Sequence, residues 1–276
     1  MSDVGTSNPI RVRRVAELLM WARRNQQPVR ELPADLQPAD LNEAYEMQTA
    51  VTLLRAVPIA GFKIGLTSQA SQRATGASEP IVGRLGLLDI RRANSRIELP
   101  SQHLRIVEAE VIFEIGADLP AERAPFNEQR VAGSLRRAFA GIELCNARIE
   151  DREDTPLTQV VADNSNAELI IVGEPLQSWD VATLANLPVS LEVGGEPPVK
   201  GSTANVLGQP LRAVTWLANW LARHGEGLKS GQLVASGSCT GMTQIGADAV
   251  VVARFGERDQ VRVEFTSAAN KREVRT

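Results

Sequence analysis

Glutamates alternate with apolar residues in the segment from Arg105 to Ile115 (RIVEAEVIFEI). Successive side chains of a β-strand point to opposite faces, so Glu108, Glu110 and Glu114 share one face and the odd-numbered apolar residues share the other. Like charges held side by side on a sheet destabilise it unless a cation neutralises them. The segment therefore predicts a strand whose acidic face is either solvated or bound to a hard divalent cation.

The composition favours a globular protein that acts on a small molecule. The 276 residues are 43% hydrophobic and 23% charged with a formal net charge of -3, which gives no electrostatic footprint for nucleic acid. The two cysteines, Cys145 and Cys239, form no C-x-x-C pair, so we expect neither a disulfide framework nor a thiolate zinc site. The N-terminal apolar patch is broken by Glu17, unlike a signal sequence, and no run is long enough to span a membrane. We expect a cytoplasmic protein.

Helical patterns are few. Apolar spacing predicts an amphipathic helix from Ile10 to about Asn25, and the capping-box pattern of Asp40 and Glu43 predicts a second that ends before Pro58. These helices suggest an N-terminal helical lobe over residues 1–57, integrated with a β-rich unit over residues 58–276. Further helices are expected over 127–139 and 210–224, the second with two tryptophans placed for core or subunit packing.

Short apolar runs after residue 58 predict many strands. They cover 61–66, 106–115, 141–149, 168–172, 189–193, 232–236, 249–255 and 260–266, the last two joined as a hairpin. Strands and helices do not alternate regularly, so the predicted fold class is α+β, a mixed β-roll or sandwich with an N-terminal helical lobe.

A third glutamate, Glu143, lies in the strand predicted over 141–149. Taken alone it would be a strand-edge carboxylate, but three carboxylates from two neighbouring strands would suit Mg²⁺ or Mn²⁺, which prefer oxygen ligands. The only histidines, His103 and His224, are expected at the surface or at a helix cap, which disfavours a zinc site.

Two other segments could contribute polar groups. Lys63 lies between glycines in Gly61–Gly65: it is either a snorkelling surface residue or, if buried near the carboxylates, a proton-transfer group or a partner for an anionic substrate. Hydroxyls and free N–H groups in Ser236–Gly241 could hold a carboxylate, with a plain turn as the alternative, and Asp163–Asn166 is a polar turn that could face a site.

Five motifs occur in order along the chain: GFKIGLTS (61–68), VEAE (107–110), IELCNARI (142–149), VADN (161–164) and LGQPLRAVTWLAN (207–219). Together they resemble the 2-keto-4-pentenoate hydratase and 4-oxalocrotonate decarboxylase family, within the fumarylacetoacetate hydrolase superfamily. The resemblance implies a metal-binding β-roll catalytic domain, a Mg²⁺ or Mn²⁺ ion on Glu108, Glu110 and Glu143, and catalytic Lys63 beside a bound 2-oxo acid. It also implies that the substrate contacts Leu66, Ser165, Ser238, Thr240 and Gly241.

The chain departs from this family at Ile81. Typical members carry an acidic residue in a Pro-Asp-aromatic-Gly motif, where this chain has Pro80-Ile81-Val82-Gly83. Ile81 cannot transfer a proton, and the nearest acidic residue in the sequence is Glu79.

The resemblance implies hydration of a 2-hydroxyalka-2,4-dienoate, such as 2-hydroxypenta-2,4-dienoate, to a 4-hydroxy-2-oxoalkanoate in meta-cleavage aromatic catabolism. The alternatives, in order, are decarboxylation of a 2-oxo-3-enedioate of the 4-oxalocrotonate type, hydrolysis of an acylpyruvate carbon–carbon bond, and a non-catalytic 2-oxo acid binder or partner subunit. Neither histidine falls at the family's catalytic histidine position, which disfavours hydrolysis. The missing acid at Ile81 leaves the non-catalytic alternative open, and the presence of Glu108, Glu110, Glu143 and Lys63 argues against it. We further expect a homo-oligomer, and a complex with a related decarboxylase or hydratase is a possible assembly.

Overall fold

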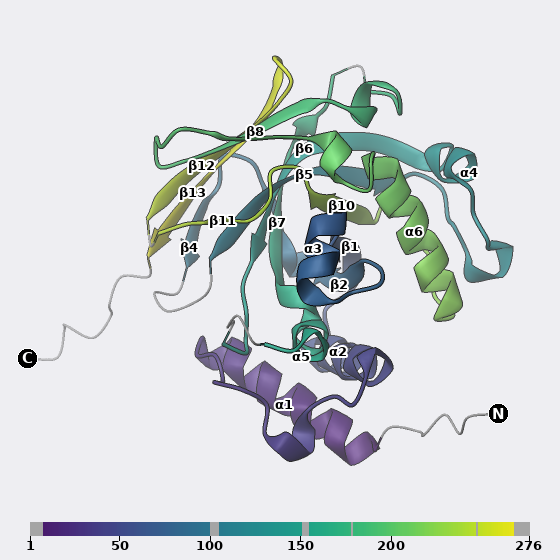
Figure 1. The fold of residues 1–276 in the computed structure, drawn as a ribbon, viewed down its shortest axis with the longest axis vertical. Coiled ribbons are helices and arrows are strands. Elements are labelled where there is room, and N and C mark those ends of the chain that lie inside the picture. The colour runs from purple at the N-terminus through teal and green to yellow at the C-terminus, as the bar shows by residue number, and fades with distance from the viewer. Residues whose placement is uncertain (1–7, 100–104, 151–154, 178, 247, 268–276) are drawn as a thin grey trace, which may run out of the picture.

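Two mixed β-sheets and six α-helices make up the described part of the chain, which in this computed structural model covers residues 8–99, 105–150, 155–177, 179–246 and 248–267 (Figure 1). The helices are α1 (Pro9–Asn25), α2 (Leu41–Arg55), α3 (Gln69–Thr75), α4 (Glu128–Ala132), α5 (Leu157–Ala162) and α6 (Pro210–Arg223). The large sheet has the order β2 (Ile81–Gly86), β1 (Ile59–Gly65), β10 (Leu233–Ser238), β5 (Ile106–Ile115), β6 (Leu135–Cys145), β7 (Ala167–Pro175), β3 (Ile90–Arg92), with β11 (Thr243–Gln244) also paired to β5. The small sheet has the order β4 (Arg96–Leu99), β13 (Asp259–Ser267), β12 (Ala249–Phe255), β8 (Pro188–Val193), β9 (Val199–Ser202).

The two faces of β5 enter different environments, as the alternation of its sequence predicts. Val107, Val111 and the other odd-numbered residues belong to the main core, which β12, β13 and α6 also line. The opposite face of the large sheet carries a separate buried cluster with members from five strands: Leu85, Ile112, Phe139, Ala167, Ile170 and Ala235. These strands run from β2, at one end of the sheet order, to β7, next to the strand at the other end, so the sheet curls around the cluster. The predicted α+β roll is confirmed.

The curled sheet closes through side chains where β2 meets the 3-10 turn Asn164–Asn166, which precedes β7. The side-chain amide of Asn164 accepts a hydrogen bond from Arg84 N and donates one to Arg84 O, both at 2.8 Å. The Ser165 hydroxyl donates to Val82 O at 2.7 Å. An amide side chain thus takes the place of a strand neighbour and fixes β2 against the turn.

The N-terminal helices α1 and α2 pack together at the lower end of the molecule in Figure 1. Both helix predictions are confirmed, and the Asp40 side chain caps α2 by accepting from Glu43 N at 2.9 Å. Their apolar faces share one buried cluster with Ile81, Ile149 and Val161. The division into a lobe over residues 1–57 and a roll over 58–276 stays a prediction, and this shared cluster joins the two parts.

The helix predicted over 127–139 is wrong. Only α4 forms, it ends at Ala132 before Gly133, and β6 begins at Leu135. Residues 135–145 pair with the whole length of β5 and bury Ala138 and Phe139, and this pairing outweighs local helical preference. The strand predicted to reach residue 149 stops at Cys145, since Asn146 N instead donates to Asn166 O in the turn before β7.

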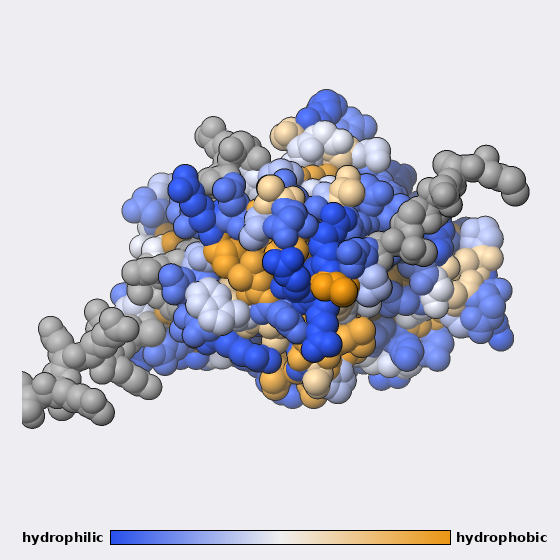
Figure 2. Space-filling model, turned by 90° about the horizontal axis from the view of Figure 1, so that it is seen from below, coloured by the Kyte–Doolittle hydropathy of each residue, from blue (hydrophilic) through white to orange (hydrophobic). Residues whose placement is uncertain are grey.

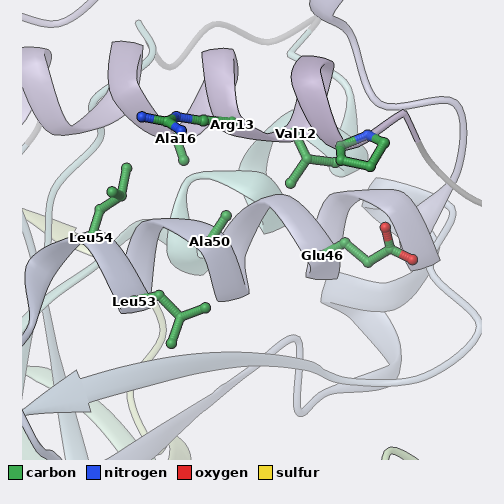
Figure 3. Close-up of a pocket in the computed structure, with 8 residues that line it drawn as sticks. Val12, Arg13, Ala16, Glu46, Ala50, Leu53 and Leu54 are labelled. Carbon is green, nitrogen blue, oxygen red and sulfur yellow. The ribbon is translucent and has the colours of Figure 1, made fainter.

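A groove between α1 and α2 is lined by apolar side chains, among them Val12, Ala50, Leu53 and Leu54, with polar groups at its rim (Figure 3). Figure 2, seen from this end of the molecule, shows hydrophobic patches on a mainly hydrophilic face. The groove shares no lining residue with the site described below. None of the described helices is long and apolar enough to cross a membrane.

Candidate functional site

Three glutamates meet inside the roll where β5 pairs with β6. Glu108 lies directly opposite Glu143 in the ladder, and Glu110, two residues further along, shares their face. Glu110 and Glu143 are each 1% exposed, and Glu108 is partly exposed. The structure thus brings the three predicted carboxylates together. Glu114 lies at the far end of β5, where two arginines of β6 bind it, and it takes no part in this cluster.

Lys63 reaches the cluster from β1, although β10 and β5 separate β1 from β6 in the sheet. Its Nζ lies 3.2 Å from Glu143 Oε1 and 4.0 Å from Cys145 Sγ. Burial lowers the pKa of the Lys63 ammonium, but the acidic groups around it, led by Cys145 and Glu143, raise that pKa overall above its ordinary value. Lys63 is therefore a buried cation beside the carboxylates and not a snorkelling surface residue.

A bulge in β10 aims a backbone donor at Glu110. The pairing of β10 with β5 shifts between Ala235 and Ser238, and Gly237 N donates to Glu110 Oε2 at 2.9 Å. Gly237 has a φ of +116°, and a Cβ there would lie 2.2 Å from Thr67 Oγ1, so glycine is required at this position. Burial, and after it the charge of Glu143, raises the pKa of Glu110 well above its usual range, and the same two causes raise the pKa of Glu108.

The donor set fits a hard divalent cation. Both carboxylate oxygens of Glu143 are buried without a hydrogen-bond partner in the described part of the chain, and the Lys63 ammonium lies 3.2 Å from one of them, Oε1. Three clustered carboxylates facing one ammonium leave negative charge and oxygen lone pairs unsatisfied, which is costly in a buried place. A Mg²⁺ or Mn²⁺ ion on Glu108, Glu110 and Glu143 would satisfy both, because these ions prefer oxygen ligands.

Cys145 belongs to this cluster and was not among the predicted site residues. Its Sγ lies 3.7 Å from Glu108 Oε2, and ligand atoms of Glu108, Glu143 and Cys145 lie within 4.8 Å of one another. Burial raises the pKa of the Cys145 thiol well above its ordinary value. Strand alternation was the available signal, because Cys145 follows Glu143 by two residues and so shares its face.

Gly83 leaves room for the stem of Lys63 and for the Asn164 carbonyl. Gly83 lies opposite Lys63 in the ladder between β1 and β2, and a Cβ on Gly83 would lie 2.7 Å from the Asn164 carbonyl oxygen and 2.9 Å from Lys63 Cγ. The absence of a side chain at Gly83 therefore lets the turn and the lysine stem occupy the space that a Cβ would fill.

The predicted substrate contacts lie in segments next to the carboxylates. Ser238 pairs with Glu110 in the ladder, its hydroxyl interacts with the Glu108 carboxylate and so offsets part of the rise that burial causes in the pKa of Glu108, and Thr240 Oγ1 accepts from Ala109 N at 3.4 Å. Gly241 follows, exposed, with a φ of +79°. The role of these residues in binding substrate stays a prediction.

Leu66 and Ser165 have left-handed backbone conformations, with φ of +57° and +52°. Such conformations are strained in non-glycine residues and tend to gather at functional sites. The hydroxyl proton of Ser165 is already bonded to Val82 O, so toward a ligand Ser165 offers its oxygen lone pairs.

Ile81 lies close to Lys63 and is buried. A Cβ built on Gly65 would lie 3.0 Å from Ile81 Cγ1 and 3.6 Å from Lys63 Nζ, so the apolar side chain and the ammonium both lie over Gly65. Glu79 does not replace the missing acid here, because its Oε2 accepts from Trp216 Nε1 at 3.0 Å and from Arg223 at 3.2 Å. Glu79 and Ile81 line a cavity of about 370 Å³ beside α6.

The histidines contribute no described ligand to the cluster. His224 caps the C-terminus of α6 and stacks on Trp220 with ring centroids 3.9 Å apart, in agreement with its predicted role. Trp216 and Trp220 are in van der Waals reach of the main core, which confirms their predicted packing role. His103 lies outside the described residues.

Comparisons with known proteins agree with this architecture. Residues 89–273 match the Fumarylacetoacetate (FAA) hydrolase C-terminal family. The TodF product hydratase of Pseudomonas putida F1 is 31% identical over 97% of this chain and 100% of its own length. The 2-keto-4-pentenoate hydratase of Paraburkholderia xenovorans LB400 is 30% identical over 91% of this chain and 94% of its own.

Among solved structures, 4-oxalocrotonate decarboxylase from Pseudomonas putida G7, complexed with magnesium and adipate, superposes with a TM-score of 0.84. It is 27% identical, and the match covers 94% of this chain and 99% of that one. Family match, sequence relatives and superposition all extend over most of the chain. The chain therefore belongs to the fumarylacetoacetate hydrolase family, in the group that includes the 2-keto-4-pentenoate hydratases.

Proposed function

We propose that this chain is a divalent-metal-dependent hydratase that converts a 2-hydroxyalka-2,4-dienoate, such as 2-hydroxypenta-2,4-dienoate, to a 4-hydroxy-2-oxoalkanoate. The observation that carries the proposal is the buried ammonium of Lys63, 3.2 Å from Glu143 within a cluster of three carboxylates. The relatives named 2-keto-4-pentenoate hydratase, about as long as this chain, support the choice of reaction.

Glu108, Glu110 and Glu143 would hold a Mg²⁺ or Mn²⁺ ion. When bound, the ion would serve as a Lewis acid toward the carboxylate and 2-oxygen of the substrate. Gly237 N keeps one oxygen of Glu110 fixed by its hydrogen bond, which leaves the other oxygen free for a ligand.

Lys63 would move the protons of the reaction. Its ammonium is charged at rest and can donate a proton to the carbon chain as the dienol becomes a ketone. The neighbouring acidic groups raise the pKa of Lys63 and burial lowers it, so a cation that offsets the acidic charge would make the proton of Lys63 easier to release. Ile81, apolar and buried, takes no part in these proton transfers, and water addition at C4 completes the hydration.

Decarboxylation of a 2-oxo-3-enedioate is the second candidate. The superposition on 4-oxalocrotonate decarboxylase over nearly the whole of both chains favours it. Both reactions draw electrons toward the same 2-oxo end of the substrate, so the groups at the far end of the pocket decide between them.

Product analysis tests the proposal. Purified protein with Mn²⁺ is given 2-hydroxypenta-2,4-dienoate and, separately, a 2-oxo-3-enedioate, and NMR follows the products. A hydratase forms 4-hydroxy-2-oxopentanoate from the first faster than the spontaneous reaction, and Lys63→Met abolishes this. Carbon dioxide release from the second substrate, with no hydration of the first, would instead establish the decarboxylase.

A further inference from the structure

The Cys145 thiol is placed among the carboxylates that would hold the cation. Its Sγ lies 3.7 Å from Glu108 Oε2, and the cluster that it forms with Glu108 and Glu143 spans at most 4.8 Å between ligand atoms. A metal with bonds of about 2.3 Å to sulfur and about 2.1 Å to oxygen would set those two ligands about 3.1 to 3.6 Å apart, for bond angles from 90° to tetrahedral. The sulfur and the oxygen are already close to that spacing.

A second observation points to a ligand between these groups. Both oxygens of Glu143 are buried without a hydrogen-bond partner among the described residues, only Oε1 has an ion-pair contact there, with Lys63 Nζ at 3.2 Å, and Glu143 itself is 1% exposed. Cys145 shares the strand face of Glu143 and lies 7% exposed, so sulfur and carboxylate open toward the same space. The other cysteine, Cys239, is part of the main apolar core and is absent from the cluster.

We propose that Cys145 is a sulfur ligand of the bound cation, and that it shifts the preference of this centre from Mg²⁺ toward thiophilic divalent ions such as Co²⁺ and Zn²⁺. This inference rests on the proposed metal site and goes beyond it by adding a fourth ligand. On binding, the S–H bond breaks, the proton passes to the solvent, and a sulfur lone pair forms the bond to the cation, so no oxidation state changes. Thiolate favours softer ions and carboxylate favours Mg²⁺, so one sulfur among three carboxylates makes a mixed centre.

Cobalt binding to the metal-free, full-length protein tests the proposal by absorption spectroscopy. We expect a thiolate-to-cobalt charge-transfer band in the near ultraviolet that saturates together with the visible ligand-field bands. Cys145→Ser should abolish the charge-transfer band and keep the ligand-field bands, because the glutamates still bind. Cys239→Ala is the matched control and should keep both. The ratio of the Mg²⁺ to the Co²⁺ dissociation constant should fall about 10- to 100-fold in Cys145→Ser.

The proposal is overturned if the wild-type cobalt complex lacks the charge-transfer band, if the band survives in Cys145→Ser, or if cobalt does not bind. Circular dichroism checks that the variant is folded, and Cys145→Ala replaces it if serine disrupts the core. Dienoate turnover is measured separately with Mg²⁺. Dienoate turnover without a cobalt–sulfur band would refute Cys145 as a ligand and leave the hydratase proposal standing. The band without turnover of any dienoate would refute the hydratase and leave Cys145 as a ligand.

Discussion

Glu108 and Glu143 repel each other in the metal-free protein, so Glu108→Gln should stabilise that state. Ligand atoms of the two side chains lie within 4.8 Å. At an effective dielectric constant of about 20, two unit charges at such a distance repel by about 3.5 kcal/mol. The variant also loses the attraction between Glu108 and Lys63, which offsets part of this gain. We expect a net stabilisation of about 1–2 kcal/mol, and each kcal/mol raises Tm by about 2–4 °C in a chain of this size.

Scanning calorimetry measures the Tm of the wild type and of Glu108→Gln, first in EDTA and then in Mn²⁺. Mn²⁺ at about 100 times its Kd should stabilise the wild type by about 2.7 kcal/mol and the variant much less, so their order of stability reverses. Glu192→Gln, in an exposed pair with Arg254, is the control and should not alter the response to metal. A metal-free variant less stable than the wild type, or an equal Mn²⁺ gain in both, would refute the reasoning.

Three further outcomes follow from the contacts around Lys63 and α2. In Gly83→Ala the added methyl group should clash with Lys63 Cγ and the Asn164 carbonyl oxygen, lower the free energy of unfolding by about 1–3 kcal/mol, and lower kcat while KM changes less. An unchanged kcat in a folded variant would contradict this positioning of Lys63. Lys63→Met should leave Glu143 without its cation partner and lower metal-free stability by about 3–5 kcal/mol in urea unfolding, and an unaltered midpoint would speak against it. Tyr45, the single tyrosine, should ionise near pH 12 in the folded protein because burial raises its pKa from 10.0 to about 12. The folded state should then lose, as the pH rises from 10 toward 12, the stability that it has below pH 10. Ultraviolet titration of Tyr45 without and with urea measures its pKa in the folded and the unfolded chain, and equal midpoints would disprove this prediction.

The strand β5 and the facing of Glu108 and Glu110 could be predicted because the alternation of side chains in a strand has a fixed period. The same rule placed Glu143 correctly, but it could not say that β5 and β6 are neighbours. The helix expected over 127–139 failed because pairing along the whole of β5 is a long-range interaction that local spacing does not contain.

The position of Lys63 depends on the curvature of the sheet, which no local pattern records. The strand β2 was missed because its short, glycine-containing sequence, IVGRLG, gives a weak strand signal. Its partner Asn164 closes the roll with a side-chain amide, and only the folded arrangement shows that pairing. Cys145 could have been added to the candidate site from its spacing to Glu143.

The most direct test of the metal-dependent hydratase is the decay of 2-hydroxypenta-2,4-dienoate absorbance with purified protein, first in EDTA and then after excess Mn²⁺, for the wild type and Glu108→Gln. We predict that the wild type shows only the spontaneous rate in EDTA, accelerates on Mn²⁺ addition and forms 4-hydroxy-2-oxopentanoate, while the variant stays near the spontaneous rate. Equal acceleration of wild type and variant, or acceleration that persists in EDTA, would contradict a reaction that depends on a cation held by these carboxylates.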